Sequence, residues 1–192
     1  MKKILITRKL IKSSEEYASS IFDVKLNKED RVLTKGELIS QSNDCDGVLT
    51  SLSEKFDVDT ISKLSGKIKI ISNFAVGVGN IDLDAAKKMN IVVTNTPDVL
   101  TDATAEIAIL VLLGAARRAK EGMEWANKKN WKWSADFLMG KQLTGSRLGI
   151  LGMGRIGRAV ADRGRSFGMK IHYYNRSRLD KNLEKDAIYH KS

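Results

Sequence analysis

The chain has 192 residues, of which 42% are hydrophobic and 29% are charged, and its formal net charge is +10. This length suits one large or two small globular domains, and the composition excludes a low-complexity or collagen-like chain. The single cysteine, Cys45, excludes an internal disulfide and a cysteine-based metal site, and the spacing of His172 and His190 predicts no metal ligands.

The apolar segments predict neither a leader peptide nor a membrane span. The opening residues 1–9 have too short an apolar core for a signal peptide and are typical of a first strand. The most apolar run, residues 107–116, is too short to cross a bilayer. We therefore expect a soluble, cytoplasmic protein with no membrane partner.

The positive charge does not predict a nucleic-acid partner. The lysines are scattered along the chain, and no helix-turn-helix pattern or basic aromatic platform accompanies them. Much of the charge is a solvated surface, and the rest is typical of a field that attracts an anionic nucleotide and an anionic substrate. The arginines that gather around one glycine-rich motif are Arg155, Arg158, Arg163, Arg165, Arg176 and Arg178.

Residues 1–97 alternate between short apolar segments and helix-compatible segments. Asp57 and Asp82 are predicted helix N-caps. Strand and helix in alternation predict a flavodoxin-like parallel sheet covered on both faces, which forms the first domain. The predicted strands are 4–7, 24–26, 47–50, 68–72 and 91–94, and the predicted helices are 14–21, 35–41, 58–64 and 83–89.

Pro97 breaks this alternation and marks the crossing into a second domain, residues 98–192. A long interdomain helix is predicted over 99–127. Its centre, residues 107–113, is apolar all round, which predicts burial at a domain or subunit interface. The tryptophans predicted to pack this helix onto a neighbouring domain are Trp125, Trp131 and Trp133.

A glycine motif follows a short strand and opens a helix. Gly152 is expected to permit a tight turn, Gly154 a close approach of the backbone to phosphate, and Gly157 close packing of helix on strand. A second strand at 170–174 completes a βαβ unit. The pattern predicts a pyrophosphate cradle in the first half of a Rossmann dinucleotide-binding domain. The alternative is a purely structural strand-to-helix turn.

The end of that second strand bears on cofactor choice. NAD sites place Asp or Glu there, whereas a nearby arginine accommodates the 2′-phosphate of NADP. This chain has Asn175, Arg176 and Ser177 instead of a carboxylate. We therefore expect NADP rather than NAD, with Arg176 as the phosphate partner and Ser177 as a hydroxyl donor. A solvated basic loop is the alternative.

Three stretches, residues 71–82, 93–106 and 148–157, carry a family resemblance. In this order they resemble the N-terminal portion of the NAD(P)-dependent D-isomer-specific 2-hydroxyacid dehydrogenases, closest to the glyoxylate/hydroxypyruvate reductases among them. The resemblance implies reduction of a small 2-oxo acid, such as glyoxylate or hydroxypyruvate, to the 2-hydroxy acid with NAD(P)H. It also implies a homodimer.

The resemblance assigns roles to individual residues. It implies that the backbone N–H groups of Val76 and Gly77 bind the substrate carboxylate, in the manner of an anion nest. The alternative is that Gly77 and Gly79 merely enable a turn. Leu52 is a weaker candidate for lining the substrate pocket, and Thr104 is expected near the nicotinamide, unless it is simply a helix cap.

The same resemblance places the N–H groups of Arg155 and Ile156 on the pyrophosphate, with an added side-chain contact from Arg155. It places the catalytic arginine, acidic residue and histidine after Ser192, so we nominate no catalytic residue here. We expect the chain to be truncated before them, and expect no NADPH oxidation with glyoxylate by these 192 residues. The alternative function is a non-catalytic dinucleotide-binding regulatory protein of the same fold.

Overall fold

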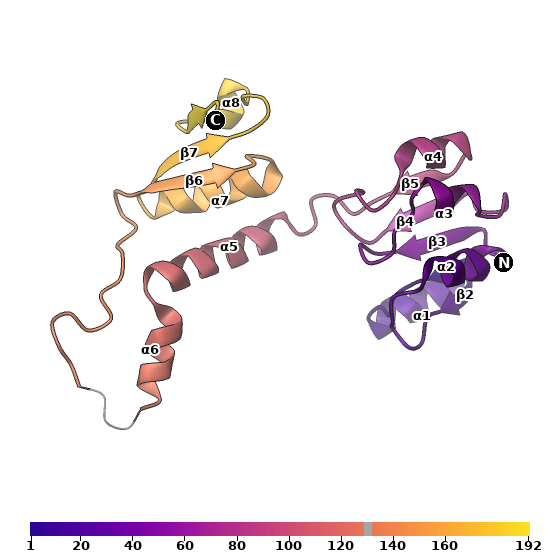
Figure 1. The fold of residues 1–192 in the computed structure, drawn as a ribbon, viewed down its shortest axis with the longest axis horizontal. Coiled ribbons are helices and arrows are strands. Elements are labelled where there is room, and N and C mark those ends of the chain that lie inside the picture. Colours follow the sequence, from indigo (N-terminus) through magenta and orange to yellow (C-terminus); the bar gives the residue numbers. More distant parts are fainter. Residues whose placement is uncertain (129–131) are drawn as a thin grey trace. The chain divides into compact units, whose positions relative to one another are not determined.

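The computed structural model of the chain describes residues 1–128 and 132–192 (Figure 1). Its contacts divide it into two compact units, Met1–Pro97 and Asp98–Ser192. Trp131, predicted to help pack the long helix, lies outside the described residues. Among the described helices, none is long and apolar enough to cross a membrane.

The first unit is built on a parallel five-stranded sheet in the order β2-β1-β3-β4-β5. This strand order is that of flavodoxin-like folds, so the predicted fold class is confirmed. Parallel strands need crossover helices, which explains the alternation in the sequence. The strands are β1 (Lys3–Ile6), β2 (Asp23–Leu26), β3 (Gly47–Thr50), β4 (Ile70–Asn73) and β5 (Val92–Thr94).

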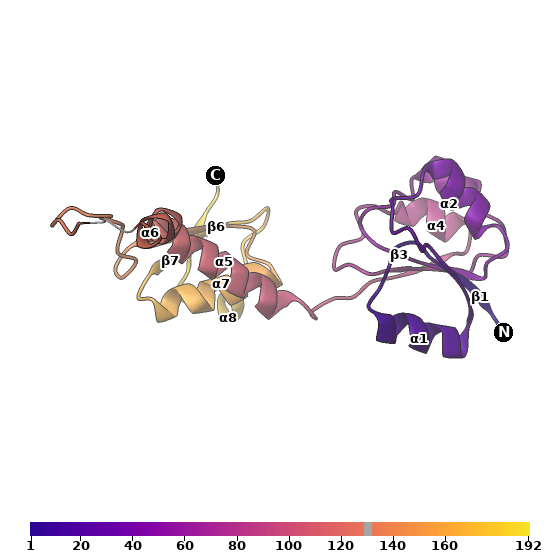
Figure 2. The ribbon, with the colours of Figure 1, turned by 90° about the horizontal axis from the view of Figure 1, so that it is seen from below.

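The helices of this unit cover both faces of the sheet. Because crossovers are right-handed, the reversal of direction after β2 puts α1 on one face and the later helices on the other, as Figure 2 shows for α1 against α2 and α4. None of the ten described residues of α1 is buried. The helices are α1 (Lys12–Ile21), α2 (Lys35–Ser42), α3 (Val58–Ser62) and α4 (Leu83–Lys88).

Side-chain caps define where three of these helices begin. The Asp57 side chain accepts from the Thr60 N–H at 2.8 Å, and Asp82 accepts from the Ala85 N–H at 2.8 Å, so both predicted caps are confirmed. Sequence inspection missed the capping box in which Thr34 and Glu37 satisfy each other's backbone N–H groups at the start of α2.

The prediction of one helix over 99–127 is wrong. The structure has α5 (Thr101–Ala116) and α6 (Ala119–Ala126), separated at Arg118, whose φ of 55° is left-handed. The Ala116 carbonyl, which a continuous helix would pair with the residue four positions later, accepts from the Lys141 N–H at 2.7 Å. Arginine and lysine favour helices, so the sequence carries no signal for this break.

Within this single chain α5 is partly exposed, so its burial at a domain or subunit interface stays a prediction. Only Ala105 and Ile109 of the helix are buried. Leu110 and Val111 are each 63% exposed. The helix packs one side against its own unit and leaves an apolar side open to solvent.

The second unit contains a parallel three-stranded sheet in the order β6-β7-β8. It is the βαβαβ arrangement of half a Rossmann domain, as predicted. The last helix and strand were not predicted, because both are too short to show a hydrophobic period. The elements are β6 (Arg147–Leu151), α7 (Arg155–Ser166), β7 (Lys170–Tyr174), α8 (Lys181–Glu184) and β8 (Ile188–His190).

Candidate functional site

The glycine motif forms the connection from β6 to α7. Gly152 has φ of 96°, a conformation that L-residues with side chains rarely adopt, and Gly154 is the N-cap residue of α7. A Cβ added at Gly157 would overlap the carbonyl oxygen of Gly152, whereas one added at Gly154 would meet nothing within 4 Å. Gly157 is therefore required by packing, and the open space at Gly154 is available to a ligand.

The start of α7 fits a bound pyrophosphate. Helix geometry leaves the N–H groups of Arg155, Ile156 and Gly157 without intrahelical partners, and among the described residues no side chain caps them. These donors and the positive end of the helix dipole are complementary to phosphate oxygens. The cradle that a Cβ at Gly154 would fill lies beside them.

The Arg155 side chain is already engaged. Its Nε lies 2.8 Å from the Asp98 carboxylate, and both side chains are more than half exposed. An exposed pair of this kind contributes little to stability. The guanidinium of Arg155 is thus paired with Asp98 through Nε, while its backbone N–H belongs to the uncapped start of α7.

Asn175 holds the glycine loop in place. Its Oδ1 accepts from the Met153 N–H at 2.7 Å, next to the bond of 2.9 Å from the Gly152 N–H to the Tyr174 carbonyl. The Met153 side chain is fully buried in the core of the second unit. Asn175 is one of the three residues expected at the cofactor, and its Oδ1 is occupied by the glycine loop.

Arg176 and Ser177 are exposed in the turn after β7. Among the described residues, Arg176 has no ion-pair partner. The neighbouring Arg178 is committed: its Nε and Nη2 donate to the two carboxylate oxygens of Glu184 at 3.0 and 2.9 Å. The cation left for a phosphate in this turn is Arg176.

Glu184 anchors this turn from the inside. Its side chain is 5% exposed and its Oε1 also accepts from the Tyr173 hydroxyl at 2.9 Å. The Tyr173 oxygen in turn accepts from the Leu179 N–H at 3.1 Å. Hydrogen bonds from Arg178 lower the pKa of Glu184, and burial raises the pKa of Tyr173. The carboxylate thus stays charged, and the turn carrying Arg176 is fixed at both ends.

Thr104 lies in the first turn of α5 with its side chain exposed. Its N–H donates to the Leu100 carbonyl at 2.9 Å, and Leu100 is the N-cap residue. The capping alternative for Thr104 is therefore wrong, and its hydroxyl stays free for a ligand.

The loop after β4 presents a second set of backbone donors, in the first unit. The Gly77 carbonyl accepts from Asn73 Nδ2 at 2.8 Å, and the Val76 carbonyl accepts from Asn95 Nδ2 at 2.7 Å. Within the described part of the chain, the N–H groups of Val76 and Gly77 donate to no hydrogen bond. With carbonyls held and N–H groups free, this loop can bind a carboxylate.

Asn73 and Asn80 tie this loop to the loop after β3. Asn73 Nδ2 donates to Asn80 Oδ1 at 3.0 Å, and Asn80 Nδ2 donates to the carbonyls of Ser51 and Glu54 at 2.9 and 3.0 Å. Leu52 lies between these two acceptors in sequence and is 64% exposed. Sequence reasoning missed both asparagines, because an amide at a strand end has no distinctive spacing.

Glu54 is a buried carboxylate that sequence reasoning also missed. Its Oε2 accepts from the hydroxyls of Thr7, Thr50 and Ser53 at 3.0 to 3.1 Å. Its Oε1 is buried without a hydrogen-bond partner among the described atoms. The carboxylate cross-links the carboxyl ends of β1 and β3 beneath the loop that carries Leu52.

Residues 4–185 match the family described as D-isomer specific 2-hydroxyacid dehydrogenase, catalytic domain. A glyoxylate reductase of Thermococcus kodakarensis is 40% identical over 181 residues, which are 92% of this chain and 54% of that protein. A glycerate dehydrogenase of Hyphomicrobium methylovorum is 39% identical over 100% of this chain and 60% of its own length. The chain thus spans little more than half the length of these relatives.

Solved structures agree with this match. A Polaromonas sp. JS6 66 protein assigned to the NAD-binding D-isomer specific 2-hydroxyacid dehydrogenases is 41% identical, with a TM-score of 0.88 over 100% of this chain and 60% of its own. A glyoxylate reductase from Paecilomyes thermophila is 32% identical, with a TM-score of 0.74 over 98% of this chain and 60% of its own.

Gly154 and Gly157, the second and third glycines of the motif, allow a matched test. Gly157→Ala places a Cβ against the Gly152 carbonyl, so we expect a lower melting temperature together with loss of dinucleotide binding. Gly154→Ala meets open space, so we expect an unchanged melting temperature and at least about tenfold weaker dinucleotide binding, because a methyl group occupies the cradle. Equal loss of stability in both variants would contradict this division.

Proposed function

This chain belongs to the family of D-isomer specific 2-hydroxyacid dehydrogenases, and we propose that it supplies the 2-oxo-acid loop and the pyrophosphate cradle of an oxidoreductase using NADP. The main observation in support of this proposal is that no side chain among the described residues caps the start of α7. That start follows the turn at Gly152, whose φ is left-handed. The family match supports assigning this cradle to a nicotinamide dinucleotide rather than to another phosphate ligand.

When bound, the dihydronicotinamide supplies the hydride that reduces a 2-oxo acid to a 2-hydroxy acid. In this proposal the chain's own residues bind and orient. The N–H groups of Arg155 and Ile156 hold the pyrophosphate, the Thr104 hydroxyl meets the nicotinamide end, and the N–H groups of Val76 and Gly77 hold the substrate carboxylate. Each group is free of intramolecular partners in the described residues, which supports these assignments.

Glyoxylate or hydroxypyruvate is the proposed substrate. The support is the likeness to glyoxylate reductases and a glycerate dehydrogenase, whose names concern two- and three-carbon acids. The backbone donors of the Val76–Gly77 loop suit the carboxylate of any 2-oxo acid, so they support the substrate class. In this proposal the length of the substrate's carbon chain is selected by Leu52 and its neighbours.

NADP is proposed over NAD. No carboxylate stands at the end of β7, where an NAD site would bond the ribose hydroxyls. Arg176 is exposed without an ion-pair partner in the described residues, while Arg178 is held by Glu184. A free guanidinium on a turn anchored by its neighbour is suited to a phosphate monoester.

We expect Arg176→Ala to weaken NADPH binding about 10- to 100-fold, since a charge-assisted hydrogen bond contributes about 1.5–3 kcal/mol. NADH binding should change less than twofold in the same titration. Arg147→Ala is the matched control, because Arg147 begins β6 at the end remote from the glycine loop. Equal weakening of NADPH and NADH by Arg176→Ala would remove Arg176 from the 2′-phosphate site.

The alternative is a dinucleotide-binding regulator without catalysis. The cradle at the start of α7 serves such a protein equally well, because it binds a dinucleotide whether or not hydride transfer follows. Calorimetric titration with glyoxylate separates the two functions. We expect the reductase to bind glyoxylate and Asn73→Ala to weaken that binding, because Asn73 holds the Gly77 carbonyl. A regulator would bind NADPH and give no heat with glyoxylate.

The open apolar side of α5 supports a homodimer as the proposed assembly. Ile107, Leu110 and Val111 are each at least 60% exposed. Exposed apolar side chains at this density are typical of an interface between subunits.

Light scattering should give a molar mass of twice 21.3 kDa for the wild-type chain and of 21.3 kDa for the Leu110→Asp variant. A wild-type monomer would contradict the dimer.

A further inference from the structure

Two neighbouring loops of the first unit are joined by one side chain, that of Asn80. Its Nδ2 donates to the carbonyl of Ser51 at 2.9 Å and to the carbonyl of Glu54 at 3.0 Å, so both amide protons are used. Between these two residues lies Leu52, which is 64% exposed. A single amide therefore holds both ends of the turn at residues 51–54, the Leu52 turn.

The oxygen of the same amide is tied to the loop after β4. Asn80 Oδ1 accepts from Asn73 Nδ2 at 3.0 Å, and Asn73 Nδ2 also donates to the Gly77 carbonyl at 2.8 Å. Asn73 is fully buried. A flip of either amide would place acceptor against acceptor, so only one orientation of the pair satisfies all of these bonds. The Gly77 carbonyl and the Leu52 turn are thus held at a fixed spacing.

Glu54 holds the Leu52 turn to the sheet beneath it. The residue is 1% exposed, and its Oε2 accepts from the hydroxyls of Thr7 and Thr50 at 3.0 and 3.1 Å. Displacing the turn would leave a buried carboxylate without these donors, which is costly. The Leu52 turn is therefore rigid with respect to the carboxyl ends of β1 and β3, and its position can limit what binds beside it.

We propose that Asn80 is a positioning residue that determines substrate specificity. By fixing Leu52 relative to the backbone donors of Val76 and Gly77, it limits the carbon chain of the 2-oxo acid that the first unit accepts. The inference rests on the proposed function, in which those donors bind the substrate carboxylate. A substrate anchored at one loop has its carbon chain limited by the wall that the other loop supplies. Because the spacing is fixed, the wall does not move aside for a longer chain.

A purely structural role for Asn80 has a different consequence. A variant that merely destabilises the first unit lowers the fraction of binding-competent chain and weakens all ligands of that unit by the same factor, so the ratio of two affinities stays constant. Loss of a fixed wall changes that ratio, because short and long 2-oxo acids contact the wall differently. The ratio of affinities therefore separates the two roles.

Calorimetric titration of the 192-residue chain with glyoxylate and with 2-oxobutanoate tests the proposal. We expect the wild type to bind glyoxylate at least about tenfold more tightly, the discrimination that a close-fitting pocket achieves for one methylene. Asn80→Asp keeps the acceptor for Asn73 and loses both donors to the Leu52 turn, so the ratio should fall at least about fivefold. Asn80→Ala should lower the ratio likewise, which covers the case that the added carboxylate prevents folding. Ile68→Val, in the core at the opposite end of β4, should keep the wild-type ratio.

A double variant shows whether Asn80 acts through Leu52. Leu52→Ala removes the wall, so adding Asn80→Asp to it should change the ratio less than about twofold. A wild-type ratio in a folded Asn80 variant would overturn the inference, and so would a further fivefold fall in the double variant. A wild type that binds neither acid would overturn the proposed function and this inference with it, whereas glyoxylate binding with an unchanged ratio in the Asn80 variants overturns the inference alone.

Discussion

The second unit depends on one close approach, between Gly157 on α7 and the carbonyl of Gly152 at the end of β6. No side chain fits between them, because a Cβ on Gly157 would overlap that carbonyl oxygen. The approach sets the start of α7 against the strand end and aims three unpaired N–H groups at the space beside Gly154. The proposed pyrophosphate site is therefore formed before any ligand binds, so we expect little ordering entropy to be lost on binding.

Side chains around both candidate loops hold backbone atoms and leave ligand-facing donors free. Asn175 holds the Met153 N–H in the glycine loop, and Asn73 holds the Gly77 carbonyl in the loop after β4. Glu184 fixes the turn that carries Arg176 by accepting hydrogen bonds from the guanidinium of Arg178. In each case a buried or half-buried polar group is satisfied locally, which keeps the loop rigid without consuming the groups that would meet a ligand.

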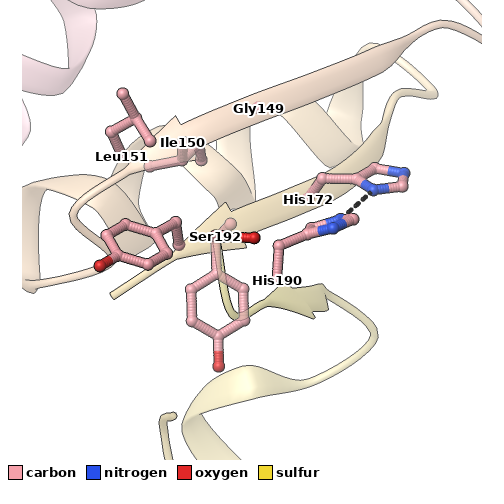
Figure 3. Close-up of a pocket in the computed structure, with 8 residues that line it drawn as sticks. Gly149, Ile150, Leu151, His172, His190 and Ser192 are labelled. Carbon is pink, nitrogen blue, oxygen red and sulfur yellow. Dashed lines mark hydrogen bonds between the residues drawn. The ribbon is translucent and has the colours of Figure 1, made fainter. Parts of the chain in front are cut away.

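Much of the fold could be predicted from the sequence, because alternating apolar strands and amphipathic helices have a direct period signal. The glycine spacing likewise predicted the turn at Gly152 and the close packing at Gly157. The break at Arg118 could not be predicted, since it is accompanied by a long-range hydrogen bond from the Lys141 N–H to the Ala116 carbonyl, which has no signal in the local sequence. The role of Glu184 could not be predicted because it lies on a four-residue helix, α8, and the hydrogen bond of 2.8 Å between His172 and His190 (Figure 3) depends on a three-residue strand, β8. Both elements are too short to recognise from sequence.

We propose that the start of α7 is a preformed pyrophosphate site. Amide resonances of a ¹⁵N-labelled chain, followed during titration with NADPH and then with NADH, test it most directly. The claim predicts that the amides of Arg155, Ile156 and Gly157 shift with both dinucleotides and saturate together, while residues around Arg176 respond to NADPH alone. Unchanged amides at 155–157 at saturating NADPH would contradict it.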